Sequence, residues 1–343
     1  MTTPGMSNTR RFAHYPPDRI RAAVGFEEVT ESVARAFADR SRGLGDSPVA
    51  VFAPKGRDGD VHVKSAWLPG RAIFTVKVAT WFAARAERGD PPSAGIVAAF
   101  DARTGDLRAL LEDDHHLSDI RTAAAGALAT RALARSDAAT LSVLGTGVQA
   151  YLQVLAAASE RPIREVRVWG RNPKRGDRLA RAVLARRPDL RVTLSPTPQA
   201  ACRGADVLVT ATSSTEPLVE PEWLEPGIHI TAVGADDREK CELAPACLAR
   251  ADRIVVDSRD LTKEYGDLAR AIAEGVIRSE QQWTELGELL ANDESGRTGP
   301  GEITVCKLVG LGVQDLAAAE VTLARLEAGT TPPRQPASAA DLR

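Results

Sequence analysis

The spacing of apolar residues along the chain changes near residue 139. Upstream of that point, apolar positions at helical spacing that end at Gly43 predict a helix over residues 26–43. Runs that alternate apolar and polar residues, separated by turn-forming segments, predict strands of an antiparallel or mixed sheet. These strands are expected at residues 49–54, 60–68, 72–79 and, as a hairpin that turns at Thr104-Gly105, 95–111.

A second pattern follows a long helix, which is expected over residues 117–135 with Ser118 as its N-cap. From residue 139 onward, apolar strands alternate with helical segments. Strands are expected at 139–145, 165–170, 192–195, 206–212, 229–235, 253–258 and 303–310, and helices at 148–160, 175–187, 198–205 and 313–329. This alternation predicts an α/β fold with a doubly wound parallel sheet of the Rossmann type.

The composition narrows the class of protein without fixing its function. The chain has 343 residues, 43% of them apolar and 26% charged, which is enough for a sizeable core and two domains. Its net charge of −2 gives no electrostatic reason to expect a nucleic-acid or membrane partner. The N-terminus has no apolar signal segment, and no apolar run reaches the ~18 residues that span a bilayer. We therefore expect a cytoplasmic protein.

The cysteines do not predict a metal site or a disulfide framework. There are four, Cys202, Cys241, Cys247 and Cys306. Cys241 and Cys247 are close in sequence, but no further cysteine or histidine stands at a useful spacing beside them. A chain of this length also needs no disulfides to form a core.

A glycine-rich turn lies where the second pattern begins. It reads Gly145, Thr146, Gly147, Val148, Gln149 and Ala150. A strand precedes it and a helix follows, which is the setting in which such a turn binds the phosphates of a dinucleotide. The first glycine permits the tight turn, the second lets the backbone approach a pyrophosphate, and the alanine lets helix and strand pack closely. The alternative is a strand–turn–helix corner that binds nothing.

The end of the second strand of this pattern bears on which dinucleotide would bind. An acidic residue there reads the adenosine ribose of NAD, but this chain has Arg171 and Asn172 instead. A guanidinium can hold a 2′-phosphate or stack on adenine, which slightly favours NADP over NAD. The alternative is a solvated basic loop.

A lysine interrupts an apolar strand in the first half of the chain. Alternation gives that strand two faces, one with Thr75, Lys77 and Ala79 and one with Phe74, Val76 and Val78. The second face is expected to be the core face, whereas the small, polar first face suits a ligand. A buried lysine needs a partner, often a ligand carboxylate. The alternative is that Lys77 faces solvent, and Lys64 in the neighbouring apolar stretch raises the same question.

Arg121 is expected near the start of a helix rich in alanine, where small residues would let another element approach. A cation in the first turn opposes the helix dipole, so a bound anion would account for it. The alternative is a surface arginine paired with Asp119.

Asp236 and Asp237 follow the strand expected at 229–235. Ligands bind at the carboxyl ends of strands in a doubly wound sheet, so an acid there is placed for proton exchange. The alternative is a turn or N-cap aspartate. His115 and His116 are expected to lie in a solvated loop before the helix at 117–135.

Six segments in a fixed order resemble the motifs of a known family. They are FTVKVAT (74–80), LSDIRTAAAGALA (117–129), LGTGVQA (144–150), VRVWGRNP (166–173), HITAVGADDREKCEL (229–243) and ITVCKLVGLGVQDLAAA (303–319). On these motifs the chain resembles the ornithine cyclodeaminase and mu-crystallin family from about residue 25 to 328.

The resemblance implies a homodimer in which a Rossmann domain is inserted into a mixed α+β domain for substrate binding and dimerisation. The inserted dinucleotide-binding domain would span 121–305, and the other domain 1–120 plus 306–330. Residues 331–343 are polar and rich in proline, and are expected to be disordered.

The matching motifs also imply roles for individual residues. Lys77 and Arg121 would hold the carboxylate and imine region of the substrate, and Asp236 would be the acid–base residue. Val148 and Gln149 would contact the pyrophosphate. The residues implied to line the cofactor are Ser93, Thr212, Val233, Gly234 and Lys240, and Val309 is implied to contact the substrate.

One departure from the cyclodeaminase pattern concerns the substrate. Thirteen residues before the strand lysine, cyclodeaminases carry a glutamate suited to a distal ammonium, and this chain has Lys64 there. A cation would repel ornithine and attract a second carboxylate, as in iminosuccinate. The arginine that cyclodeaminases place just upstream is also not evident in the segment SPVAVFAP (47–54).

The sequence therefore predicts NAD(P)H-dependent reduction of an α-imino acid to an amino acid, or the reverse dehydrogenation. A dicarboxylic imine such as iminosuccinate is a candidate substrate, because the motifs look most like the iminosuccinate reductase and ectoine-utilisation branches. Two alternatives stay open, an ornithine cyclodeaminase that forms proline and a non-catalytic NADP-binding protein of the crystallin type.

Overall fold

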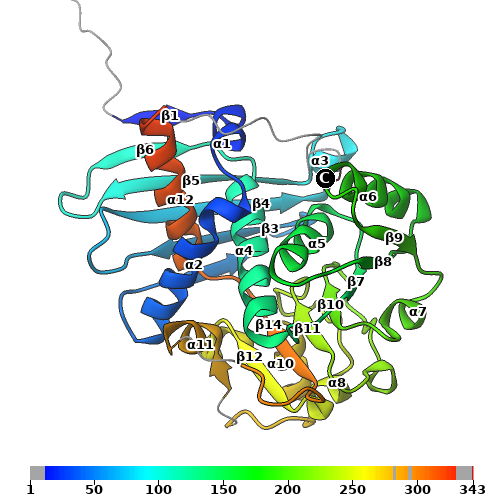
Figure 1. Cartoon of the computed structure of the whole chain (residues 1–343). Coiled ribbons are helices and arrows are strands. Elements are labelled where there is room, and N and C mark those ends of the chain that lie inside the picture. Colours follow the sequence, from blue (N-terminus) through cyan, green and yellow to red (C-terminus); the bar gives the residue numbers. More distant parts are fainter. Residues whose placement is uncertain (1–11, 281–282, 293–295, 330–341, 343) are drawn as a thin grey trace, which may run out of the picture.

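Two β-sheets organise the chain in the computed structural model (Figure 1). The structure describes residues 12–280, 283–292, 296–329 and 342. The tail expected to be disordered, 331–343, lies outside the described residues apart from residue 342. The prediction of an α/β fold with a Rossmann-type parallel sheet and a second, mixed sheet is confirmed.

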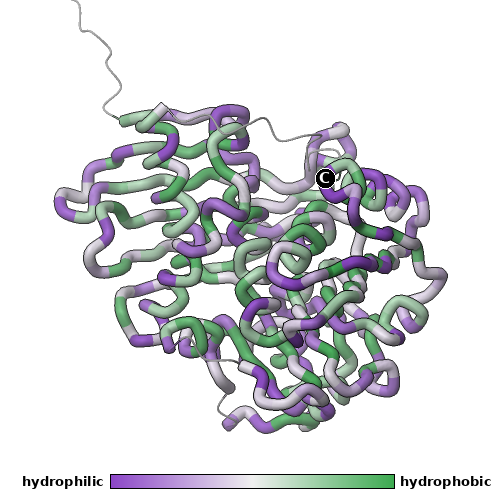
Figure 2. The backbone as a smooth tube through the Cα atoms, viewed as in Figure 1, coloured by the Kyte–Doolittle hydropathy of each residue, from purple (hydrophilic) through white to green (hydrophobic). Residues whose placement is uncertain are grey.

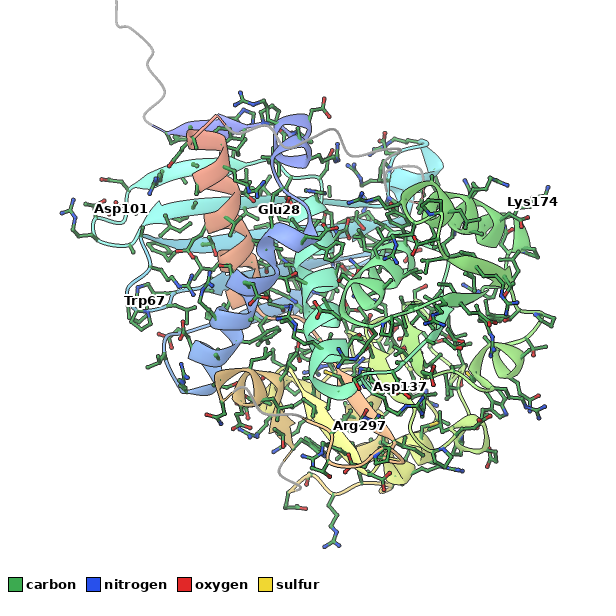
Figure 3. The ribbon with its side chains drawn as sticks, viewed as in Figure 1. Glu28, Trp67, Asp101, Asp137, Lys174 and Arg297 are labelled. Atoms are coloured by element: carbon green, nitrogen blue, oxygen red, sulfur yellow. The ribbon has the colours of Figure 1, made fainter. Side chains whose placement is uncertain are left out.

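The first sheet has six strands in the order β1-β6-β5-β4-β3-β2. They are β1 (Ala13–Tyr15), β2 (Val49–Phe52), β3 (Gly59–Ala66), β4 (Ile73–Phe82), β5 (Ser93–Asp101) and β6 (Leu107–Leu111). Neighbours are antiparallel except β1 and β6. The expected hairpin is present, with Asp101 O accepting from Gly105 N at 2.9 Å, and Asp101 marks its outer end in Figure 3.

The buried face of β4 is the opposite of the expected one. Ile73, Thr75, Lys77 and Ala79 are buried, whereas Phe74 and its alternating neighbours are half-buried. Both faces of this strand carry enough apolar surface to be covered, so alternation alone could not choose between them. The choice is made by α12 (Gly312–Glu327), a helix from the far end of the chain that packs across β3 and β4.

The second sheet is parallel throughout and has the strand order β13-β12-β14-β11-β10-β7-β8-β9. Its strands are β7 (Thr140–Leu144), β8 (Glu165–Trp169), β9 (Arg191–Leu194), β10 (Val207–Thr210), β11 (His229–Ala232), β12 (Arg253–Val256), β13 (Thr284–Glu285) and β14 (Thr304–Lys307). Every residue of β10, β11 and β14 is buried, as expected of strands covered on both faces. The domain boundary expected at 305/306 falls inside strand β14, and all of β14 belongs to the parallel sheet.

Helices cover both faces of the parallel sheet. They are α4 (His116–Leu133), α5 (Val148–Glu160) and α6 (Pro173–Arg186) on one face, and α7 (Pro198–Cys202), α8 (Pro245–Arg250) and α10 (Gly266–Ala273) on the other. The remaining helices are α1 (Pro17–Ala23), α2 (Phe26–Ser41), α3 (Ala83–Glu87), the 3₁₀ turn η1 (Pro221–Trp223), α9 (Arg259–Thr262) and α11 (Leu286–Asn292). Hydrophobic segments concentrate inside these layers in Figure 2. Among the described helices, none is both long and apolar enough to cross a bilayer.

Helix α4 lies between the two sheets, where it packs against α2 and α12 on one side and β11 and β14 on the other. It is buried almost all round, which explains its run of alanines. The prediction of Ser118 as its N-cap is wrong, because the helix begins at His116 and Asp113 Oδ2 accepts from Leu117 N at 2.8 Å. Ser118 is thereby free to contact the strand lysine described below.

Candidate active site

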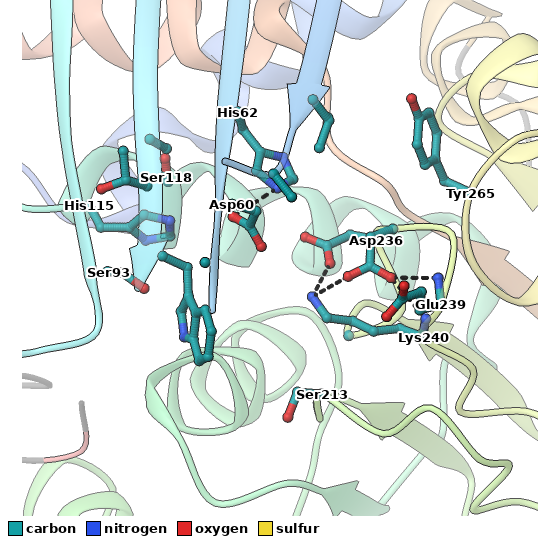
Figure 4. A pocket seen from close by; sticks show the side chains of 18 of the residues that line it. Asp60, His62, Ser93, His115, Ser118, Ser213, Asp236, Glu239, Lys240 and Tyr265 are labelled. Carbon is teal, nitrogen blue, oxygen red and sulfur yellow. Dashed lines mark hydrogen bonds and ion pairs between the residues drawn. The ribbon is translucent and has the colours of Figure 1, made fainter. Parts of the chain in front are cut away.

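A deep cleft of about 1140 Å³ runs between the covered side of the mixed sheet and the carboxyl ends of the parallel strands (Figure 4). Its walls come from β2 to β5, the start of α4 and α5, and the loops after β10 and β11. In Figure 4, Asp60 and His62 of β3 occupy one wall, and Asp236 and Lys240 the other. The cleft is large enough for a dinucleotide and a small substrate.

The glycine-rich turn joins β7 to α5 with the geometry that phosphate binding needs. Gly145 has a φ of +133°, and a Cβ there would lie 2.4 Å from Ala211 O, so a side chain is excluded. Gly147 is the N-cap of α5, and no side chain caps the free N–H groups of the first turn. Among the described residues, no heavy atom outside Gly147 and its two chain neighbours lies within 4 Å of where a Cβ on Gly147 would stand. Gln149 Oε1 is buried and has no hydrogen-bond partner in this part of the chain. The turn therefore fits a dinucleotide diphosphate.

The basic loop after β8 is exposed. The Arg171 side chain reaches solvent, and Asn172 caps α6 by accepting from Lys174 N at 3.0 Å. The capping oxygen of Asn172 is therefore already used within the fold. A role for these two residues toward a cofactor stays a prediction, as does the preference for NADP.

A buried carboxylate fixes the two loops that form the floor of the cleft. Glu242 Oε1 accepts from Thr212 N at 2.6 Å and from Thr212 Oγ1 at 2.7 Å, while Oε2 accepts from Gly234 N at 2.8 Å. A Cβ on Gly234 would lie 2.2 Å from Thr212 O, so the two loops touch. Burial, and then the nearby Asp267, raise the pKa of Glu242. Glu242 thus holds together the ends of β10 and β11.

Asp315 is the partner of the strand lysine. Lys77 Nζ lies 2.9 Å from Asp315 Oδ1 and 2.8 Å from Oδ2, and it donates to Ser118 Oγ at 3.0 Å. Arg121 Nε donates to the same Oδ1 at 3.0 Å, so one carboxylate serves two buried cations. Arg121 lies in the second turn of α4 and is 7% exposed, so the alternative of a surface arginine is wrong. Burial alone would raise the pKa of Asp315, but Lys77 and Arg121 outweigh it and lower the pKa.

Lys64 is a buried cation with a different kind of partner. Its Nζ donates to Gly310 O at 2.7 Å and lies 3.4 Å from Val309 O, and in the described chain no carboxylate lies within ion-pair distance of it. Burial, then Arg121 and Lys77, lower the pKa of Lys64 to about 7. Its ammonium is therefore poised to gain from an anion that enters the cleft.

Asp236 lies on the opposite wall, beyond the end of β11. Its Oδ1 accepts from Lys240 Nζ at 2.7 Å, and Asp237 shapes the same turn by accepting from Lys240 N at 2.8 Å. Burial alone would raise the pKa of Asp236, but the charge of Lys240 dominates and lowers it. Asp236 is therefore a carboxylate at neutral pH.

The cleft brings together many of the residues singled out from the sequence. Lining it are Lys64, Lys77, Ser93, Arg121, Gln149, Thr212, Val233, Gly234, Asp236 and Lys240. The remaining candidates are not part of its wall, namely Gly145, Thr146, Gly147, Val148, Ala150, Arg171, Asn172 and Val309. The carbonyl oxygen of Val309 contacts Lys64 in the site. The residues of the glycine-rich turn lie at the start of α5 or directly before it.

Sequence reasoning missed two buried carboxylates, Asp315 and Glu242. Both lie inside segments that carry the family motifs, but an acidic residue within a helix or loop has no local feature that distinguishes a buried from an exposed side chain. The signal that the sequence offered was their position among apolar neighbours.

The thiols of Cys241 and Cys247 donate to main-chain oxygens of Leu243 and Val219, each at 3.3 Å.

Comparison with known proteins identifies the family and the fold. Residues 18–330 match the model of the ornithine cyclodeaminase/mu-crystallin family. A solved Δ(1)-pyrroline-2-carboxylate reductase of Thermococcus litoralis, in complex with NADH and L-proline, is 28% identical with a TM-score of 0.88, covering 94% of this chain and 100% of the other. An archaeal alanine dehydrogenase dimer with bound NAD is 28% identical, with a TM-score of 0.85 and coverage of 94% and 98%.

A third solved structure is the iminosuccinate reductase of Paracoccus denitrificans in complex with NAD+. It is 30% identical to this chain, with a TM-score of 0.85, and the match covers 93% of this chain and 98% of that protein. All three are nicotinamide-dependent oxidoreductases by name.

Proposed function

This chain belongs to the ornithine cyclodeaminase/mu-crystallin family, and on that premise we propose that it is an NAD(P)H-dependent reductase of α-imino acids, able to run in reverse as an amino-acid dehydrogenase. One observation carries the proposal. Three buried cations, Lys64, Lys77 and Arg121, line one wall of the cleft, and only Asp315 pairs directly with them among the described residues. This excess of positive charge suits an anionic substrate.

Each of the cleft residues would have a separate role in imine reduction. A bound nicotinamide would supply the hydride. Lys77 and Arg121 would orient the α-carboxylate of the substrate, with their own positions held by Asp315. Asp236 would accept a hydrogen bond from the protonated imine nitrogen, because its low pKa keeps it a carboxylate that stabilises an iminium cation.

We propose a dicarboxylic imine as the substrate class because of Lys64. Lys64 stands beside Lys77 on the neighbouring strand, and in the described part of the chain its ammonium contacts only main-chain oxygens. The α-carboxylate would engage Lys77 and Arg121, leaving Lys64 for a second carboxylate. The likeness to an iminosuccinate reductase supports this assignment.

The proposal is tested by following NADH and NADPH oxidation with three kinds of substrate. These are oxaloacetate with ammonia, pyruvate with ammonia or methylamine, and a cyclic imine such as pyrroline-2-carboxylate. We expect turnover with at least one, and the highest kcat/KM with oxaloacetate and ammonia. No turnover with any of them would overturn the reductase assignment, and proline formation from ornithine with ammonia release would replace it by a cyclodeaminase.

An Asp236→Asn variant separates an enzyme from a non-catalytic binding protein. Asparagine keeps the size of the side chain but cannot stabilise an iminium cation as a carboxylate does. We expect a loss of turnover of about a hundredfold or more, in the range that groups stabilising charge in an active site contribute. Unchanged behaviour in every assay would favour a protein that only binds its ligand.

We also propose that the chain forms a homodimer through the open face of the mixed sheet. Apolar side chains from five strands gather there, namely Phe52, Val61, Val63, Phe74, Val76, Val78, Ile96, Ala98, Phe100 and Leu110. Phe74 and Phe100 stack with ring centroids 4.9 Å apart, and Phe52 is 53% exposed. A contiguous apolar face of this kind marks an association surface, and the dimeric alanine dehydrogenase supports a second copy as its partner.

A further inference from the structure

His115 has a backbone conformation that the fold must hold against its own preference. Its φ is +70°, and that of Asp114 is +47°, and no other non-glycine residue of the described chain has a positive φ. Left-handed backbone is unfavourable for residues with a Cβ, and such positions gather at binding and catalytic sites. This conformation starts α4 and leaves the imidazole in the wall of the cleft.

A buried carboxylate orients the His115 ring. Asp119, one turn further along α4, is 2% exposed, and its Oδ1 lies 3.2 Å from His115 Nδ1. This pairing fixes the ring by one nitrogen, as in other sites where a carboxylate positions a functional histidine. Nε2 is therefore the ring nitrogen left for a ligand in the cleft, where Figure 4 shows His115 close to Ser118.

The same carboxylate also holds the glycine-turn helix. Gln149 Nε2, in the first turn of α5, donates to Asp119 Oδ1 at 3.1 Å and to Asp119 O at 3.2 Å. Asp119 thus links the imidazole to the helix start that fits a dinucleotide diphosphate. Ser118, the contact of Lys77, precedes Asp119 on α4, whereas Arg121 follows it. His115 is therefore joined to the phosphate end of the cleft by the contacts from Asp119 to Gln149.

We propose that His115 is a cofactor-binding residue, whose Nε2 donates a hydrogen bond to the nicotinamide-side phosphate of the bound dinucleotide. The proposal rests on the nicotinamide-dependent function argued above. When both ring nitrogens carry a proton, Nδ1 donates to Asp119 Oδ1 and Nε2 donates to a phosphate oxygen. The link through Asp119 to Gln149 means that one rigid unit contacts the diphosphate from two helices.

Binding of three probes tests this without measuring turnover. NADH, ADP-ribose and 5′-AMP are titrated into the protein by calorimetry, with NADH fluorescence as a second readout. In the His115→Asn variant the left-handed backbone is retained, because asparagine tolerates it, and only the ring is lost. We expect NADH and ADP-ribose to bind about tenfold more weakly, as for loss of one charge-assisted hydrogen bond, and 5′-AMP, which lacks the second phosphate, to bind as before.

Two further variants guard against a purely structural effect. His115→Gly removes the ring and relieves the backbone strain, so it should weaken NADH binding equally while unfolding at or above the wild-type temperature. His116→Asn is the matched control, because His116 Nε2 lies 2.9 Å from Val24 O and the residue is not part of the cleft wall. It should bind all three probes like the wild type.

Several results would overturn the proposal. Unchanged NADH affinity in both His115 variants would do so, as would a raised KM for the imine with an unchanged Kd for NADH, since the ring would then serve the substrate. Equal weakening of 5′-AMP would place the ring on the adenosine side. If the wild type binds NADH but reduces no imine, the proposed function fails while the role of His115 stands. If it binds no nicotinamide dinucleotide, both fail.

Discussion

Lys64 and Lys77 stand directly opposite each other on the antiparallel strands β3 and β4, with both side chains buried on the same face. Like charges in this position destabilise a sheet unless something offsets them. Asp315 offsets Lys77, whereas the contacts of the Lys64 ammonium within the described residues are carbonyl oxygens. We propose that an anionic ligand offsets the charge of Lys64 instead.

Replacing Lys64 with methionine should separate stability from function. Methionine has a similar length and no charge, so we expect the free energy of unfolding to rise by ~1 kcal/mol, in the range of other stabilising substitutions. The kcat/KM for a dicarboxylic imine should fall about 30-fold, because a buried charge pair with the substrate is lost. Chemical denaturation and steady-state kinetics measure the two effects. Lys55→Met, at an exposed lysine, should change neither, and equal losses for both variants would contradict the assignment.

The pH dependence of substrate binding should report the charge on Lys64. With a pKa of about 7, Lys64 is mostly cationic below neutrality and loses its proton as the pH rises. The kcat/KM for a dicarboxylic substrate should therefore decline above pH 7 more steeply than that for a monocarboxylic one. A ratio of the two that stays constant between about pH 6 and 9 would argue against a contact with Lys64, and in Lys64→Met the ratio should be flat.

Loss of the Asp315 carboxylate should be costly for folding. Asp315→Asn leaves Lys77 and Arg121 buried without a counter-charge, and we expect a loss of about 3–5 kcal/mol in the free energy of unfolding. The matched control is Glu327→Gln, which breaks an exposed pair with Arg108 and should cost less than ~1 kcal/mol. Urea denaturation distinguishes them, and similar small losses for both would mean that the buried cluster does not depend on Asp315.

Glu242→Gln should loosen the floor of the cleft. Glutamine has one acceptor oxygen, so its NH₂ group would face the N–H of either Thr212 or Gly234, donor against donor. A buried unsatisfied donor of this kind costs about 1–3 kcal/mol in the free energy of unfolding. Because both loops line the cofactor cleft, we expect the Kd for NADH to rise about tenfold, measured by fluorescence titration. Glu327→Gln, at the exposed pair with Arg108 and away from the cleft wall, should leave the Kd unchanged. A wild-type Kd in Glu242→Gln would restrict its role to stability.

Ile96→Asp should break the proposed dimer. Ile96 is 38% exposed on the open face of the mixed sheet, so an aspartate costs the single subunit little but places a charge in the interface. Light scattering after size exclusion should show a dimer for the wild type and a single subunit for the variant. Leu184→Asp, on α6 and also 38% exposed, serves as the control and should stay dimeric. Equal masses for all three proteins would rule out this face.

The types and order of most elements could be predicted from the sequence because local periodicity carries that information. The strands of the parallel sheet are continuous apolar runs, and the turn at Gly145 needs a residue without a Cβ. The hairpin at Thr104-Gly105 and the helix that ends before Gly43 are likewise local features. The positions of Lys77, Arg121 and Asp236 at one cleft could also be anticipated, from motif order and from the rule that ligands meet the carboxyl ends of strands.

Only the tertiary structure decided which surfaces and partners these residues have. The covered face of β4 depends on α12, and the Lys77 partner Asp315 is 238 residues away along the chain. Lys64 donates a hydrogen bond to the carbonyl oxygen of Gly310, which is 246 residues away along the chain. Ser118, predicted to be an N-cap, instead contacts Lys77. Such pairings arise when distant segments pack, and no local pattern encodes them. The sequence by itself therefore determined the strands, the helices and the candidate residues, whereas packing determined burial and partners, because burial depends on what covers a surface.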